Sequence, residues 1–590
     1  MPSIHIKFAD GRDLSHDFRT GGFTLGAFRF NVTERLSGGL TEYVVSLTPA
    51  ADGALAEVTV EYPLGETAVG ECDSVLVYDN SYCSNMFASI REFANDEDTT
   101  RSREIVSVKS GNGVFSCAFT SCDRFFTDFY VWRHLVSVRF YLENKTLRAG
   151  ETYTLESFAV DSGDALAFFE KYTAVLAERY VTRPRKTVPF GWSSWSCMYG
   201  KVTEENLIPE IKNIAHIVGE GGVIQVDDGW QGNESFRGEW KYDTEKFPSG
   251  GAYPAKVAHE NGLTYGLWIA PALVHDKAPL YETLDGLIYR ENGEKKPTFM
   301  TVYPLDIGRK EVLDSYRRIF TRMKDEYGAD YFKIDFLVNL ITRIADTSKL
   351  TYDAGFAVEV YRNFTKVIRE TVGDETFLNA CGAPIGESAG VFDGIRTSSD
   401  ITWEGVGDNP NITWWEIFVK NIQNIILRSP YDRVFITDPD GLVVRGYKTP
   451  YGNDCVELSD SEALCYATAV RMSGGHILLN EETERLGEER MKLFTDSLPP
   501  IGKAARPANF FDFPYCTESY VTTDGGDTLV ALWNLGEDET ERTLDTKKYV
   551  GEGEASVVDA WTHEEYSADD GKIVFTMPRH SVKMCRIEKK

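Results

Sequence analysis

Between Val188 and Asn480 the sequence alternates short apolar runs with amphipathic stretches, and this alternation restricts the possible folds more than any other feature. Apolar strands separated by helical crossovers pair in parallel, because a parallel connection must cross one face of the sheet. The predicted strands are VPFGW, GVIQVDD, TYGLWIA, YFKID, TFLNA, GIRTSSD, RVFITD and HILLN. Eight strands are the number that a (β/α)8 barrel requires. The crossover after TFLNA is rich in glycine, so we expect only a degenerate helix there.

The segments on either side of this region show a different pattern. Runs such as ALAEVTVEY and DTLVALWNLGE alternate apolar and polar residues and are bounded by turn residues, which is typical of antiparallel strands. We therefore predict a multidomain α/β and β chain with three parts. They are an N-terminal β-sandwich at 1–180, a catalytic (β/α)8 TIM barrel at 187–495, and a small C-terminal antiparallel β domain at 496–590.

The composition excludes several classes of function. A net charge of −29 argues against nucleic acid and anionic membranes as partners, because phosphate groups require clustered Lys and Arg. No apolar run is long enough to cross a bilayer, and the N-terminus does not resemble a signal peptide. The ten cysteines include no CxxC pair, which argues against a zinc site and a disulfide scaffold. These features predict a cytoplasmic protein with reduced thiols, and they leave a homo-oligomer open.

Polar and aromatic side chains follow the predicted barrel strands, at the rim where such barrels carry their active sites. Lys333 and Asp335 are two residues apart and should share one face of their strand. Arg396 and Asp400 share a face if their segment stays extended. The other candidates at the strand ends are Trp192, Trp195, Asp227, Asp228, Trp268, Cys381, Asp438 and Asp440. Their convergence predicts a polar site with aromatic walls.

The residue types at this rim favour one kind of chemistry. His275 and His476 have no carboxylate cluster with metal-ligand spacing, so we expect no metal. Ser193 and Ser194 do not stand in a G-x-S-x-G elbow, and no phosphate-binding or dinucleotide loop is present, so we expect no cofactor. Paired carboxylates remain, and two of them flanking a glycosidic bond are sufficient for its hydrolysis.

The environments of the two carboxylates indicate their roles. A cation beside Asp335, which we expect to be Lys333, would keep Asp335 ionised as a nucleophile. Asp400 lies beyond the strand on a Ser-Ser loop, where it could act first as an acid and then as a base.

Seven motifs resemble, in order, those of glycoside hydrolase family 36, whose best-known members are α-galactosidases. They are GWSSW at 191–195, DDGW at 227–230, GLWIAP at 266–271, YFKIDFL at 331–337, CGAP at 381–384, GIRTSSD at 394–400 and DPD at 438–440. The resemblance covers the presumed barrel and implies a retaining exo-α-galactosidase that works through a covalent glycosyl-enzyme. It implies Asp335 as the nucleophile and Asp400 as the acid/base. Asp227 and Asp228 would bind O4 and O6, Lys333 the O3/O4 side and Arg396 the region near O2, while Trp192 and Trp268 line the pocket; Trp195 and Cys381 complete the substrate-binding set.

The sequence departs from the family at two points that leave alternatives open. Many relatives carry two aspartates at the acid/base position, whereas Ser399 precedes Asp400 here. The small residues at 382 and 383 could leave room beside C2 of the sugar, which keeps an α-N-acetylgalactosaminidase or α-galactosaminidase open. An α-galactosyl transglycosidase and a catalytically inactive carbohydrate-binding relative are further alternatives. Trp403, Glu404 and Asp408 could shape the leaving-group side.

Overall fold

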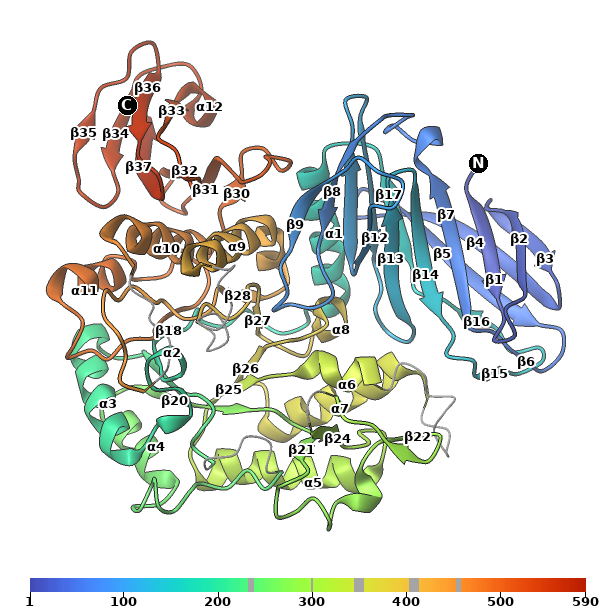
Figure 1. The fold of residues 1–590 in the computed structure, drawn as a ribbon, viewed down its shortest axis with the longest axis horizontal. Coiled ribbons are helices and arrows are strands. Elements are labelled where there is room, and N and C mark those ends of the chain that lie inside the picture. The colour runs from blue at the N-terminus through green and yellow to red at the C-terminus, as the bar shows by residue number, and fades with distance from the viewer. Residues whose placement is uncertain (232–237, 299–300, 344–354, 403–412, 452–457, 590) are drawn as a thin grey trace.

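A parallel eight-stranded barrel stands at the centre of the computed structural model, which describes residues 1–231, 238–298, 301–343, 355–402, 413–451 and 458–589 (Figure 1). The strands, which pair in chain order around the barrel, are β18 (Phe190–Ser193), β19 (Val223–Val226), β20 (Thr264–Ile269), β25 (Tyr331–Ile334), β26 (Phe377–Ala380), β27 (Gly394–Arg396), β28 (Ile436–Asp438) and β29 (Ile477–Leu479). β29 pairs with β18, and an isolated parallel bridge between Leu442 and Leu479 brings the remaining edges together. The eight strands predicted from the sequence are therefore confirmed.

Helices connect the strands and cover the outside of the barrel. They include α3 (Glu204–Val218), α4 (Ala252–Glu260), α5 (Lys310–Thr321), α6 (Leu337–Arg343), α7 (Ala357–Val372), α9 (Trp414–Leu427) and α10 (Asp460–Met472). Side chains that accept backbone N–H groups fix where α3, α9 and α10 begin, since Thr203, Thr413 and Ser459 each complete a capping box. The crossover between β26 and β27 holds only the four-residue helix α8 (Ile385–Ser388), as its glycines predicted.

The two faces of each barrel strand carry different side chains. Val223, Tyr331, Phe377, Ile436 and Leu478 form one buried cluster inside the barrel. Side chains alternate along a strand, so residues two positions further on also point inward, toward the C-terminal rim. This parity places Lys333, Asn379, Arg396 and Asp438 on the inner face above the apolar layer.

The N-terminal region contains two antiparallel sheets that pack face to face. One has the order β10 (Thr99–Ser102), β13 (Phe126–Trp132), β14 (Leu135–Tyr141), β7 (Glu57–Pro63), β1 (Ser3–Lys7), β2 (Asp13–Asp17). The other has the order β3 (Gly21–Leu25), β4 (Phe28–Ser37), β5 (Leu40–Pro49), β17 (Phe158–Asp161), β12 (Val114–Phe119), β11 (Ile105–Lys109), β8 (Val75–Asp79), β9 (Ser89–Phe93). Both sheets contribute to one buried cluster, as in a sandwich. Helix α1 (Ala165–Tyr180), which begins at the N-cap Asp164, then leads to the barrel.

The C-terminal region is again antiparallel. Its main sheet has the order β30 (Arg506–Pro507), β31 (Glu518–Thr522), β32 (Thr528–Asn534), β37 (Ser581–Lys589), β34 (Ala555–Asp559), β35 (Glu565–Tyr566), and β33 (Thr540–Asp545) pairs with β36 (Lys572–Met577). This region lies beside α9 and α10 (Figure 1). Within the described ranges, no helix is both long and apolar enough to span a bilayer.

The loop 80–88 of the sandwich packs against the barrel close to the candidate rim. Arg428, fully buried after α9, donates hydrogen bonds to the carbonyl oxygens of Ser84 (2.6 Å), Cys83 (3.2 Å) and Thr397 (3.0 Å). Ser84 also exchanges hydrogen bonds with the backbone of Ala383, both at 2.9 Å. Arg428 thus joins the sandwich loop to the loop that follows β27, and Ser84 joins it to the loop that follows β26.

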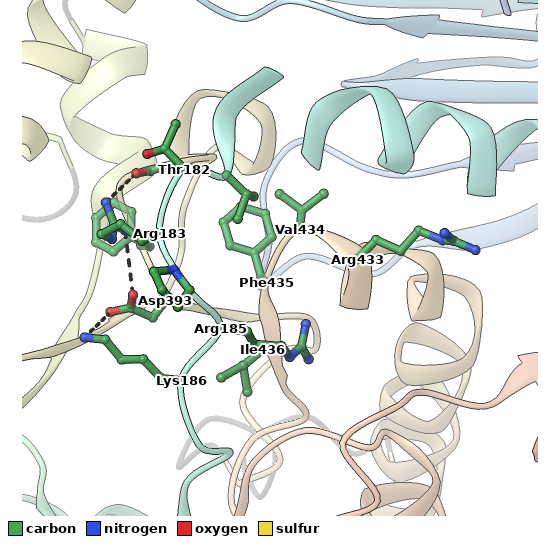
Figure 2. Close-up of a pocket in the computed structure, with 13 residues that line it drawn as sticks. Thr182, Arg183, Arg185, Lys186, Asp393, Arg433, Val434, Phe435 and Ile436 are labelled. Carbon is green, nitrogen blue, oxygen red and sulfur yellow. Dashed lines mark hydrogen bonds and ion pairs between the residues drawn. The ribbon is translucent and has the colours of Figure 1, made fainter. Parts of the chain in front are cut away.

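A small cavity lies at the opposite end of the barrel, where the linker after α1 passes under the strands (Figure 2). Asp393 forms ion pairs there with Arg183, Lys186 and Arg369. The cavity is lined by the linker 181–186, by residues that precede β27 and β28, and by Ile436 at the start of β28, and it contains none of the described residues that follow these two strands. Because catalytic groups of such barrels lie at the C-terminal strand ends, this cavity is not the candidate active site.

Candidate active site

Lys333 and Asp227 form a buried ion pair at the centre of the rim. The Lys333 Nζ lies 2.8 Å from Asp227 Oδ2, and both side chains are less than a tenth exposed. Burial lowers the pKa of the Lys333 ammonium, but the charge of Asp227 more than offsets this, so the pKa lies well above its usual value. We expected Lys333 to pair with Asp335; instead its ion-pair partner is Asp227, because that carboxylate follows β19, two strands away, on the same inner face.

Asp335 is held by two donors and remains partly exposed. Its Oδ2 accepts a hydrogen bond from Trp268 Nε1 (3.1 Å), and its Oδ1 accepts one from the backbone N–H of Phe336 (2.7 Å). Phe336 has φ +58°, an unusual conformation for a bulky residue that recurs at functional sites. Trp268 and the strained turn together fix the orientation of the Asp335 carboxylate. They supply the hydrogen bonds that stabilise an ionised nucleophile, the role that we first assigned to Lys333.

Gly382 passes close behind Asp335, in the left-handed region with φ +51°. A Cβ at this position would lie 3.3 Å from Asp335 Oδ1 and 3.5 Å from Asn85 Nδ2 of the sandwich loop. Ala383 is fully buried against Ser84. The small residues at 382 and 383 therefore accommodate this close packing, and sequence alone had left open whether they make room for a substituent on the sugar.

Arg396 links three acidic or polar groups on the other side of the site. The guanidinium is 1% exposed, and its Nη2 lies 2.5 Å from Asp400 Oδ1 and 2.9 Å from Asp440 Oδ2. Its Nη1 donates to Cys381 Sγ at 3.6 Å. The Asp400 side chain is 45% exposed and thus accessible to a ligand or to water. Arg396 and Asp400 lie together, as their spacing suggested.

Cys381 lies between the two halves of the site. Burial raises the pKa of its thiol well above the usual value, and the charges of both Asp335 and Asp400 act in the same direction. Both carboxylates therefore face this one buried sulfur. The structure brings together Asp227, Lys333, Asp335, Cys381, Arg396 and Asp400 at the rim.

The remaining predicted residues have different positions. Asp228 follows Asp227, donates its N–H to the Asp227 carboxylate (3.0 Å) and accepts from Gln231 (2.6 Å). Trp195 opens the short helix α2 (Trp195–Met198), is partly exposed and packs edge-on against Tyr199. Trp403, Glu404 and Asp408 lie outside the described residues.

Trp192 does not line the site, contrary to expectation. It pairs in register with Ile224 and Leu479, which belong to the layer between strands and helices, and its indole is fully buried. The indole N–H donates to the carbonyl of Glu481. Strand alternation explains the error, because Gly191 and Ser193 occupy the inner face of β18. Trp192 is therefore an outer-layer core residue.

The two histidines considered as metal ligands, His275 and His476, lie in different parts of the barrel. His476 lies inside the barrel, fully buried beneath the polar layer, where burial lowers its pKa to about 4. His275 pairs with Asp276 at the end of β21 (Leu273–His275). Within the described residues, no group of three or more His, Cys, Asp or Glu side chains is arranged to hold a metal ion.

Asp440 is the residue at this site whose importance the sequence did not reveal. In the sequence it follows the seventh predicted strand, and its position there assigns it no role. Its contact with Arg396 depends on how β27 and β28 align, with Arg396 opposite Asp438. The DPD motif is the signal in the sequence, because carboxylates at the C-terminal end of a barrel strand are candidate functional residues.

Two family models match the chain. The model named Melibiase matches residues 166–383, and the model of the alpha galactosidase C-terminal beta sandwich domain matches residues 521–587. Alpha-galactosidase 1 of Pediococcus pentosaceus is 26% identical over 265 residues, which cover 43% of this chain and 35% of that protein. The aligned part thus spans about a third of the length of that relative.

Two solved structures share the fold. A variant of AgaA from Geobacillus stearothermophilus, a GH36 alpha-galactosidase in complex with 1-deoxygalactonojirimycin, superposes with a TM-score of 0.67 at 14% identity, covering 100% of this chain and 89% of that one. TtGalA, an alpha-galactosidase from Thermus thermophilus, superposes with a TM-score of 0.59 at 20% identity, covering 80% and 94%. In its sequence matches this chain is similar to α-galactosidases, and it shares its fold with solved α-galactosidases that include a GH36 enzyme.

Proposed function

We propose that the protein is a retaining exo-α-galactosidase that removes terminal α-linked galactose. The observation that carries the proposal is the pair Asp335 and Asp400, two carboxylates that follow β25 and β27, the strands on either side of β26, which is followed directly by the buried thiol of Cys381. The names of the relatives support the substrate class: TtGalA was solved in complexes with p-nitrophenyl α-D-galactopyranoside and with stachyose.

In the first step, an oxygen of Asp335 attacks the anomeric carbon while the bond to the leaving oxygen breaks, and Asp400 gives that oxygen its proton. This forms a covalent glycosyl-enzyme. In the second step, Asp400 takes a proton from water, whose oxygen attacks the anomeric carbon and releases Asp335. The two inversions together retain the α configuration.

The hydrogen bonds of the site suit these roles. Trp268 and the Phe336 N–H are neutral donors that stabilise negative charge on Asp335. Asp227, held in place by its ion pair with Lys333, presents a fixed acceptor to sugar hydroxyls, and Asp228 lies beside it. A buried pair of this kind discriminates strongly against an epimer whose hydroxyl does not reach it. These ligand assignments are part of the proposal.

The test uses wild type, Asp335→Gly and Asp400→Ala with aryl α-galactoside, α-N-acetylgalactosaminide, α-galactosaminide and α-glucoside, with products followed by NMR. We expect wild type to prefer the galactoside and to release the α-anomer first. Azide should rescue Asp335→Gly with a β-galactosyl azide and Asp400→Ala with an α-galactosyl azide. Initial release of the β-anomer, or wild-type turnover by Asp335→Gly, would contradict the proposal.

The panel also decides between the alternatives. Preference for the 2-acetamido or 2-amino sugar would favour the hexosaminidase alternatives, which the tight packing of Gly382 and Ala383 does not support. Sugar binding without turnover would favour an inactive relative. The three-domain division and the cytoplasmic location are likewise proposals; the nine described cysteines, all without a disulfide, suit a reducing compartment.

A further inference from the structure

Asp440 occupies a strained and buried position directly after strand β28. It is 8% exposed, and its φ of +75° lies in the left-handed region that favours glycine. Such a conformation is uncommon for a residue other than glycine and is held in place here by the surrounding contacts. Its own N–H donates to Asp438 Oδ1 at 2.9 Å, which holds the turn. This backbone conformation directs the Asp440 carboxylate toward Arg396.

The Asp440 carboxylate binds both neighbours of Asp400. Its Oδ2 lies 2.9 Å from Arg396 Nη2, the same nitrogen that contacts Asp400. The same Oδ2 accepts a hydrogen bond from the backbone N–H of Ile401 at 2.7 Å, and Ile401 directly follows Asp400. Asp440 therefore fixes the side-chain partner of Asp400 and also the backbone that carries Asp400.

The charges of these groups bear on the first catalytic step. A buried cation beside a carboxyl group favours its ionised form, which opposes the role of a proton donor. Burial lowers the pKa of the Arg396 guanidinium, and the nearby anions, Asp440 foremost, more than offset this. Arg396 thus stays charged. A second carboxylate beside the guanidinium offsets its positive charge, so that the charge favours the ionised form of Asp400 less strongly.

Asp440 is surrounded by groups that make it suitable for this task. Those that face it are Arg396, Asp400, Lys333, Asp438 and the hydroxyl of Tyr466. Burial raises the pKa of Asp440 to about 6, with Arg396 acting against this and Asp400 reinforcing it. At neutral pH it therefore remains mostly ionised and balances the guanidinium.

We propose that Asp440 is the positioning residue of the acid/base Asp400: it anchors Arg396 and the backbone at Ile401, and it neutralises the guanidinium so that Asp400 can carry a proton into the first step. This inference rests on the proposed function, in which Asp400 donates that proton. Asp440 would also be the supporting carboxylate for Asp400, which follows Ser399 where many relatives carry a second aspartate.

The kinetic test compares Asp440→Asn with wild type on two substrates. A dinitrophenyl α-galactoside leaves without help from an acid, whereas methyl α-galactoside requires protonation. We expect kcat/KM to fall about a hundredfold for the methyl substrate and less than about tenfold for the dinitrophenyl substrate, within the range attributed to general acids. The alkaline limb of the pH profile should move to lower pH. Asp440→Glu, which keeps the charge, should leave that limb near the wild-type position even if its rate falls.

Asp432→Asn is the matched control. Asp432 is also buried and paired with an arginine, Arg506, at 2.8 Å, but it precedes β28 at the opposite end of the barrel. We expect this variant to lose stability while the ratio between the two substrates and the pH profile stay unchanged. A ratio and an alkaline limb that are unchanged in Asp440→Asn would overturn the inference.

A measurement without substrate separates this inference from the proposed function. The carboxyl carbon of Asp400, assigned by its loss in Asp400→Asn, is titrated by NMR in wild type and in Asp440→Asn. We expect its titration midpoint to be lower in Asp440→Asn, and an unchanged midpoint would refute the role of Asp440 whatever the enzyme hydrolyses. If the midpoint is lower in Asp440→Asn but wild type is inactive on every α-galactoside, the role of Asp440 stands and the proposed function is refuted.

Discussion

The ion pair between Lys333 and Asp227 gives the sharpest quantitative prediction, because its partner is not the one that sequence proximity suggested. At 2.8 Å, with both side chains under a tenth exposed, the pair is only weakly screened by solvent. Coulomb's law at an effective dielectric constant of about 20 gives a gross attraction of about 6 kcal/mol. Desolvation offsets much of this, so removing one partner should destabilise the protein by about 3–5 kcal/mol.

A double-mutant cycle measures this coupling. Lys333→Met and Asp227→Asn are made singly and together, and free energies of unfolding are determined from urea denaturation at pH 7. Each single variant leaves one buried charged group without its ion-pair partner, whereas the double variant removes both charges. We therefore expect the free energy of unfolding lost in the double variant to be smaller than the sum of the two single losses by at least about 2 kcal/mol.

The choice of pH follows from the sign of the shift. The pKa of Lys333 is raised in the folded state, so the pair contributes its full stability below the usual pKa of 10.5 and loses it only as the pH rises further. Stability at pH 7 thus contains the whole effect. A second cycle, which serves as the control, combines Lys333→Met with Asp335→Asn. A Lys333–Asp335 coupling equal to or larger than the Lys333–Asp227 coupling would refute this account of the site.

Three further predictions concern the surroundings of the site. Gly382→Ala should lower kcat at least about tenfold, because the new Cβ would lie 3.3 Å from Asp335 Oδ1 at a backbone φ of +51°. Arg428→Met should destabilise the protein by more than about 3 kcal/mol in urea denaturation, because it removes the buried hydrogen bonds that the guanidinium donates to the carbonyl groups of Ser84, Thr397 and Cys83. His476→Phe should flatten the acid limb of the stability profile: wild type, whose histidine pKa is lowered to about 4, loses about 3 kcal/mol between pH 6.5 and pH 4, since only the unfolded chain takes up the proton there.

Each of these has a control. Gly150, where an added Cβ would meet no heavy atom of the described residues within 4 Å, is a matched glycine with φ +75°, and Gly150→Ala should leave kcat unchanged. Arg428→Lys should recover part of the lost stability, and equal stability of Arg428→Met and wild type would contradict the buried contacts. An acid limb that is as steep in His476→Phe as in wild type would show that other groups cause it.

The barrel could be predicted because its signal is local. Each strand is an apolar run bounded by turns or helices, and the eight runs recur in the order that the fold requires. Parity within one strand also predicted that Lys333 and the Asp335 segment face the site. The same rule, applied to β18, would have shown that Trp192 faces outward while Gly191 and Ser193 face inward.

Contacts between strands could not be predicted in this way. Whether Lys333 meets Asp335, two residues away, or Asp227, on another strand, depends on the height of each strand in the barrel. That height follows from the register, such as Trp268 beside Lys333. The contact of Asp440 with Ile401 is of the same kind, as is the approach of Asn85 to Gly382. Long-range contacts of this sort have no periodic signature in a sequence.

The loop 80–88 has a consequence for the history of the chain. A recombination breakpoint in the linker at 181–186 would separate Arg428 from the carbonyls of Cys83 and Ser84. A sandwich from another gene would then place a different loop 80–88 beside Gly382. The sandwich and the barrel are therefore expected to have been inherited together, and changes in either one constrain the substitutions that the other accepts.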